Sequence, residues 1–145
     1  MIQLYEDLIE VLEKEFTLCR QLVVLLQREK EVIVGLDPRE LEMLLREKEE
    51  ITTSIRFCDE ARERILGKLG FSKKTISEIA GIAEMDYRER LTAIASKFTS
   101  IIHSISELNR FNSLLIEKSL YYIKTSYNFL STFDVSAHKK ISLEA

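Results

Sequence analysis

Proline, glycine and tryptophan are almost missing from this chain of 145 residues, which has one Pro, four Gly and no Trp. Because Pro and Gly are the residues that most often end helices and form turns, their scarcity predicts few turns and long helices. Hydrophobic residues make up 46% and charged residues 31% of the chain, and this balance excludes an intrinsically disordered protein. The length suits a single domain.

Other absences exclude classes of function. The longest apolar run, residues 22–26, is far shorter than the ~20 residues that cross a bilayer, so no membrane insertion is expected. The net charge is −3, and no basic run carries interleaved aromatic residues, so nucleic acid is not an expected partner. The start of the chain has acidic residues from Glu6 onward and lacks the basic region of a signal peptide. We therefore expect a soluble protein of the cytoplasm.

Motifs of catalysis and metal binding are also missing. The chain has no Gly-rich phosphate loop, no nucleophile elbow and no HExxH pair, so we expect no enzyme and no cofactor. The two cysteines, Cys19 and Cys58, lack CxxC spacing and are expected to be reduced core residues that face each other. Together with His103 and His138 they do not show the short ligand spacing of a zinc site, so no metal is expected.

What the chain does contain is apolar periodicity, interrupted first at "GLDPRE". The first periodic segment predicts a helix over about residues 2–34, ended by Gly35. Asp37 is placed to cap a second helix with Pro38 at its first position, and that helix is expected to continue to about residue 69. So short a connection requires the two helices to form an antiparallel hairpin.

The second interruption is the linker over residues 70–86, which contains Gly70 and Gly81. Within it, Ser72 is predicted to cap a short helix, and Asp86 is predicted to cap a third long helix over about residues 87–133. Residues 134–145 lack apolar periodicity and are predicted to be a flexible tail. The predicted fold is all-α: residues 1–133 form one coiled-coil-like bundle domain in which the hairpin packs against the third helix. The first helix is apolar on more than one side, as burial against two neighbours requires.

Four charged residues occupy the apolar seam of the hairpin. In an antiparallel pair the residue numbers of facing positions add up to a constant, and placing Leu36 opposite Leu41 across the turn sets that constant at 77. Glu29 then faces Lys48, and Glu15 faces Arg62. Carboxylates beside cations could act as tuned acids or bases. We favour a structural role, because a slip of one heptad would bury all four charges against leucines, so the pairs fix the register.

The third helix is too long for the hairpin. At 1.5 Å per residue its predicted 47 residues span roughly 70 Å, against roughly 50 Å for each hairpin helix. The surplus length carries more apolar and aromatic residues than one face can bury, and we expect Leu120, Tyr121 and Tyr127 to form an additional face. We predict a partner-binding surface there; its residues are Leu114, Leu115, Leu120, Tyr121, Tyr122, Ile123, Tyr127, Phe129 and Leu130.

Two asparagines, Asn109 and Asn112, lie where the third helix changes from having one apolar face to being apolar on more than one face. A polar residue on the inward row weakens packing and sets register, so both are predicted to belong to the polar core. Two structural alternatives to partner binding remain for the surplus segment. The helix could fold back on itself, or it could form the seam of a homodimer.

The sequence resembles the FlgN-type flagellar export chaperones. The resemblance lies in "LLQREKEVIVGLDPREL", "LLREKEEI" followed by "RERILGKLG", and "ELNRFNSLLIEKSL", and it covers about residues 2–130. It implies a cytoplasmic, non-enzymatic chaperone that binds the C-terminal helical region of hook-associated proteins, prevents their premature assembly and delivers them to the flagellar export gate. It also implies that the C-terminal helix binds the client and that a tyrosine of this helix contacts the gate.

Two other classes remain open on the residues alone. A generic helical adaptor or coiled-coil regulatory protein would explain everything except the surplus face and the asparagines. A histidine phosphotransfer domain would use His103, although the "HSISELN" that begins there lacks the glycine which usually makes such a histidine accessible.

Overall fold

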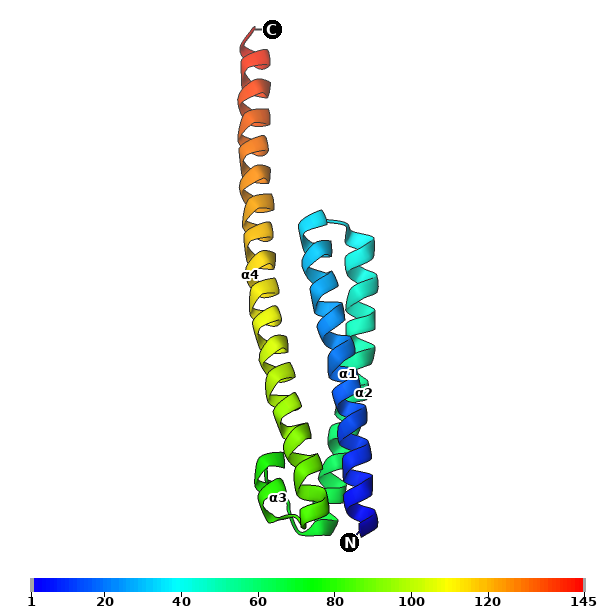
Figure 1. The fold of residues 1–145 in the computed structure, drawn as a ribbon. Helices are drawn as coiled ribbons and strands as arrows, with labels where there is room; N and C mark the ends of the chain where they lie inside the picture. Colours follow the sequence, from blue (N-terminus) through cyan, green and yellow to red (C-terminus); the bar gives the residue numbers. More distant parts are fainter. Residues whose placement is uncertain (1, 145) are drawn as a thin grey trace.

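The computed structural model describes the backbone of residues 2–144 and the side chains of residues 2–132. Four helices follow one another: α1 (Ile2–Gly35), α2 (Pro38–Leu69), α3 (Ile76–Ile82) and α4 (Met85–Glu144). The helices α1 and α2 form an antiparallel hairpin, and α4 runs beside the hairpin and continues far beyond its turn (Figure 1). The predicted all-α class is confirmed.

The central helix is α1. It packs against α2 on one side and against α4 on another, and α3 packs against α4 (Figure 1). Among the described residues, no Cα atom of α2 comes within 8 Å of one in α4. The apolar girth of α1 therefore serves two interfaces, whereas α2 buries a single face.

The hairpin turn is built from the residues that the sequence indicates. Asp37 caps α2, because its carboxylate accepts hydrogen bonds from the backbone N–H groups of Arg39 and Glu40, and Pro38 follows it. The left-handed residue of the turn is Leu36, with φ 52°, and not the glycine that precedes it. A leucine in this region is uncommon and costs roughly 1 kcal/mol of strain.

The linker differs from the prediction at two caps. Thr75, and not Ser72, caps α3, since its hydroxyl accepts from Glu78 N–H while the Glu78 carboxylate accepts from Thr75 N–H. This reciprocal capping box satisfies two backbone donors at once and determines where the helix starts. The next helix, α4, already begins at Met85, so Asp86 lies in its first turn and is not its cap.

The predicted end of α4 near residue 133 falls short, because the helix continues to Glu144. The prediction relied on the loss of apolar periodicity, but helix propagation needs only residues that fit the helix. No Gly or Pro follows Gly81 in the sequence. The side chains of residues 133–145 lie outside the described part, and the flexibility predicted for residues 134–145 stays a prediction.

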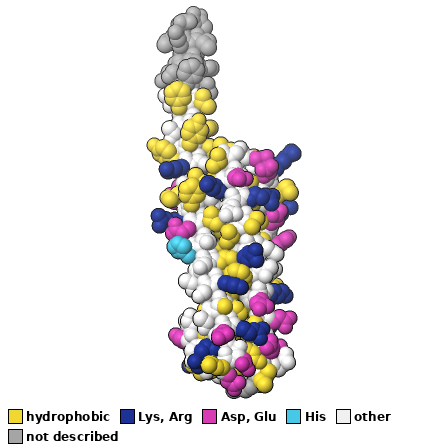
Figure 2. All heavy atoms as spheres, in the orientation of Figure 1, with side chains coloured by type: hydrophobic (Ala, Val, Ile, Leu, Met, Phe, Trp, Pro, Cys, Tyr) yellow, Lys and Arg dark blue, Asp and Glu magenta, His cyan; other side chains and the backbone are white. Residues whose placement is uncertain are grey.

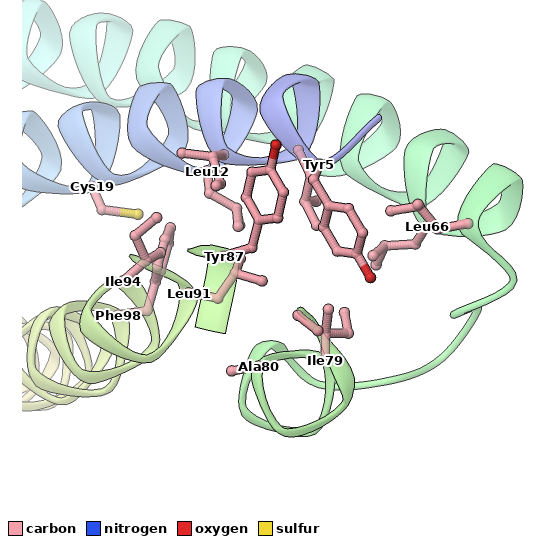
Figure 3. Packing of buried hydrophobic residues seen from close by; sticks show 14 of the residues in the cluster. Tyr5, Leu12, Cys19, Leu66, Ile79, Ala80, Tyr87, Leu91, Ile94 and Phe98 are labelled. Atoms are coloured by element: carbon pink, nitrogen blue, oxygen red, sulfur yellow. The ribbon is translucent and has the colours of Figure 1, made fainter. Parts of the chain in front are cut away.

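The main core lies at the base of the molecule, where all four helices meet. Figure 3 shows side chains from α1, α2, α3 and α4 pointing toward one another there, among them Tyr5, Leu66, Ile79 and Leu91. The rings of Tyr5 and Tyr87 stack with centroids 4.9 Å apart. A second, smaller cluster of Leu25, Val32 and Leu44 joins α1 to α2 near the hairpin turn. The stability of the fold is therefore concentrated at the end opposite the overhang of α4.

Candidate functional site

A buried polar cluster marks the last place where all three long helices are joined. The Glu29 carboxylate on α1 accepts from Lys48 Nζ of α2 at 3.2 Å and from Asn112 Nδ2 of α4 at 3.0 Å. Asn112 Nδ2 also donates to the Leu26 carbonyl at 2.9 Å. The side chains of Glu29 and Asn112 are almost completely buried. We call Glu29, Lys48 and Asn112 the polar node; it holds the three helices in one register.

The second predicted pair, Glu15 with Arg62, lies nearer the base. Arg62 Nη1 donates to both oxygens of the Glu15 carboxylate, at 3.1 and 2.9 Å, and its other terminal nitrogen donates to Asp59. Burial raises the pKa of the Glu15 carboxyl above its ordinary value, since the loss of solvation outweighs the attraction of Arg62. The structure thus brings both seam pairs together as the register predicts, which suits a structural role.

The two asparagines do not share one role. Asn112 is buried in the polar node, and its Oδ1 is buried without a hydrogen-bond partner in the described structure. Asn109 is exposed, so its predicted place in the polar core is wrong. Because a helix turns 100° per residue, the side chains of Asn109 and Asn112 point in directions about 60° apart. Asn109 therefore lies beside the seam and not within it.

Beyond the polar node, α4 leaves its neighbours and its apolar side chains become exposed. Figure 2 shows hydrophobic side chains gathered on this part of α4, next to the grey atoms, with few charged groups among them. Tyr121 has 74% of its surface exposed, and Tyr127 has 70%. The other exposed members of the predicted surface are Leu114, Leu120, Tyr122, Ile123, Phe129 and Leu130. Only Leu115 is half-buried. We call residues 114–130 the overhang of α4.

The heptad pattern of α4 explains this change. One inward position is occupied by Leu91, Phe98 and Ile105 and then by Asn112, Ser119 and Ser126. The other inward position keeps large residues, ending with Leu115, Tyr122 and Phe129. Large side chains on the core side of a helix need a partner helix to cover them. The overhang therefore keeps the heptad spacing of the core, but one of its two inward positions carries small polar side chains instead of large apolar ones.

An apolar groove of about 250 Å³ separates the overhang from the hairpin turn. Ile116, Leu120 and Ile123 form its wall on α4. The opposite wall comes from both sides of the turn, and it consists of Val32, Ile33, Leu36, Asp37, Pro38 and Leu41. Leu120 therefore lines this groove with Ile116 and Ile123, whereas Tyr121 and Tyr127 do not line it.

The hairpin side of this groove was missed by the sequence interpretation, which assigned Leu36 to the seam opposite Leu41. In the structure, 53% of the Leu36 surface is exposed. A weak signal existed in "GLDP": a leucine between the helix-ending glycine and the cap has no helix face on which to be buried.

The remaining candidates carry little chemistry. Cys19 and Cys58 are both buried and unpaired, and burial raises the pKa of the Cys19 thiol to about 11. Little reactive thiolate therefore forms on Cys19 at neutral pH. His103 is exposed on α4. Within the part of the chain that the structure describes, no group of three or more His, Cys, Asp or Glu could hold a metal ion, and no helix is both long and apolar enough to cross a membrane.

The structure defines an all-α protein in which a buried polar node joins three long helices and one of these helices carries an exposed apolar overhang. The family model described as "FlgN protein" matches residues 1–135. The chain belongs to this family, and with it to the flagellar export chaperones. No curated protein and no solved structure matches the chain significantly.

Proposed function

We propose that this chaperone acts in the cytoplasm on hook-associated proteins, binding their C-terminal helical region through the overhang of α4. The proposal rests on one observation: eight of the large apolar side chains of the overhang, from Leu114 to Leu130, are at least 47% exposed in a chain that otherwise buries its inward residues. An apolar surface of this kind on a helix is a site for another helix. The family to which the chain belongs supports a client that travels through the flagellar export system.

Binding would also explain how assembly is prevented. A helical segment that a filament protein uses to assemble has an apolar face of its own, and that face cannot contact α4 and a neighbouring subunit at the same time. The chaperone would then carry its client to the export gate, with a tyrosine of the overhang as the gate contact. Tyr121 and Tyr127 are the most exposed candidates.

The test replaces Leu120, Tyr121 and Tyr127 together with serine. Each is at least 62% exposed, so the thermal unfolding of the bundle should stay nearly unchanged. Affinity for hook-associated proteins, measured by calorimetry with the purified proteins, should fall by at least about tenfold. Met43→Ser with Phe57→Ser is the matched control, since these residues are 58% and 64% exposed on α2.

Two results would contradict the proposal. The first is a triple-serine variant that binds hook-associated proteins as tightly as the parent. The second is a parent protein that is a stable dimer through α4 and releases its partner copy only when it unfolds, because the overhang would then be an internal seam.

A further inference from the structure

The groove beside the hairpin turn raises the question of what fills it. Its two walls come from α4 and from the α1–α2 turn, so a molecule inside it would contact three helices at once. The lining is almost wholly apolar. Leu36 is held in this lining in the left-handed region, with φ 52°, although its side chain is half exposed. The strained backbone presents an apolar side chain to the groove where glycine or asparagine would fit more easily.

The groove continues an interface that the molecule already has. From Leu91 to Asn112 the inward row of α4 packs against α1, and the same row then runs past the turn as Leu115, Ser119 and Tyr122. The periodicity is that of helix packing throughout, so the occupant is a helix. Ser119 lines the groove and leaves room where the core would have a large side chain. The occupant must therefore supply large aliphatic residues at this level.

The charged residues beside the groove indicate what kind of helix occupies it. Lys118 and Lys124 fall on opposite edges of the apolar face of α4 at 100° per residue. Glu117 lies on the edge of Lys124, and residues 118–132 include no acidic residue. A parallel second copy of the overhang in register would place lysines near lysines and serines opposite serines. Asp37 is the only acid in the lining, and its carboxylate accepts from two backbone N–H groups of α2.

We propose that the groove between the hairpin turn and the overhang receives one amphipathic helix of a partner protein, with large aliphatic residues on its apolar face and carboxylates at its edges placed to meet Lys118 and Lys124. This inference rests on the proposed function and refines it, because it makes the α1–α2 turn half of the client site. The client helix then lies in line with the hairpin and extends the bundle along α4.

The test uses two designed amphipathic peptides with the same aliphatic heptads, one with glutamate and one with lysine along its edges. Binding to the full-length chain is measured by fluorescence anisotropy. The glutamate peptide should bind at least about threefold more tightly, and this difference should disappear at high salt. Leu36→Asn should weaken its binding by about tenfold, because one apolar wall is lost.

Leu36→Asn keeps the fold, since asparagine tolerates a φ of 52°. Met43→Ser is the control, because Met43 is 58% exposed on α2 and does not line the groove. The inference is overturned if Leu36→Asn binds the glutamate peptide as tightly as the parent, or if the lysine peptide binds equally well. It is also overturned if light scattering shows a parent dimer that Leu36→Asn converts to monomers, since the occupant is then a second copy.

The same variants separate this inference from the proposed function. If the triple-serine variant loses hook-associated proteins while Leu36→Asn retains them, the overhang is the client site and the turn is not part of it. If both variants retain these proteins at parental affinity, both proposals are wrong.

Discussion

The two ends of α4 differ in what their apolar residues do. At the base, Leu91 is fully buried among side chains of all four helices, as Figure 3 shows. In the overhang, Leu120 has 62% of its surface exposed beside a groove. The two residues have the same side chain and lie on one continuous helix. Only the presence or absence of a neighbouring helix makes the first a source of stability and the second a candidate contact for a client.

The polar node lies between the base and the overhang and marks the boundary between them. Up to Ile105 one inward position of α4 is large and apolar, and from Asn112 onward it is polar and small. A buried asparagine costs stability relative to an apolar residue, but it allows only the alignment in which its hydrogen bonds form. The node thus fixes where α4 stops packing against the hairpin.

The loss of a buried side chain at the base of α4 should have the largest effect on stability. Leu91→Ala should lower the free energy of unfolding by about 3 kcal/mol, since the leucine is completely buried. Leu120→Ala should change it by less than about 0.5 kcal/mol. Urea denaturation of both variants measures the difference. Equal losses at the two positions would mean that the overhang is packed in solution, by folding back or by dimerisation.

A smaller effect is expected at the boundary. Asn112→Ala should lower the free energy of unfolding by about 1–2 kcal/mol, because the buried Glu29 carboxylate loses a donor and the contact between α4 and α1 is weakened. Asn109→Ala is the matched control on the same helix and should have nearly no effect, since Asn109 is exposed. Hydrogen exchange of α4 should also increase around the node in the first variant only. An unchanged stability of Asn112→Ala would show that the node does not secure α4.

The smallest effect concerns the ion pair nearer the base. The folded protein holds the pKa of Glu15 above its unfolded value, so it binds a proton there more readily than the unfolded chain does. The stability contributed by this protonation is present at acid pH and is lost as pH rises through the folded pKa. Relative to Glu15→Gln, the parent should therefore gain stability as the pH is lowered from 7 to about 4.5.

Urea denaturation of both proteins at several pH values measures this difference. Glu10→Gln, on the exposed side of α1, is the control and should show no such trend. A difference between the parent and Glu15→Gln that shrinks on acidification would indicate that Arg62 stabilises the ionised form more than burial destabilises it.

Much of the hairpin could be predicted because its signals are local or follow from one constraint. Gly35, Asp37 and Pro38 determine where the first helix stops and the second begins. Once the turn is known, an antiparallel pair has a single free parameter, its register. The predicted register pairs Glu29 with Lys48 and Glu15 with Arg62, and both pairs are present in the structure. The linker was predicted less well, because Ser72 and Thr75 are both capable caps and only Thr75 has a glutamate three residues later.

Spacing along one or two helices is enough to predict the all-helical fold, the paired charges of the hairpin and the excess of apolar residues on the last helix. Tertiary structure alone decided that Asn112 joins Glu29 while Asn109 faces solvent. It also decided that Leu36 and Leu120 face a common groove. Asn112 and Glu29 are 83 positions apart, and Leu36 and Leu120 are 84 positions apart. Their placement depends on the angle at which α4 leaves the hairpin, which cannot be read from a local sequence pattern.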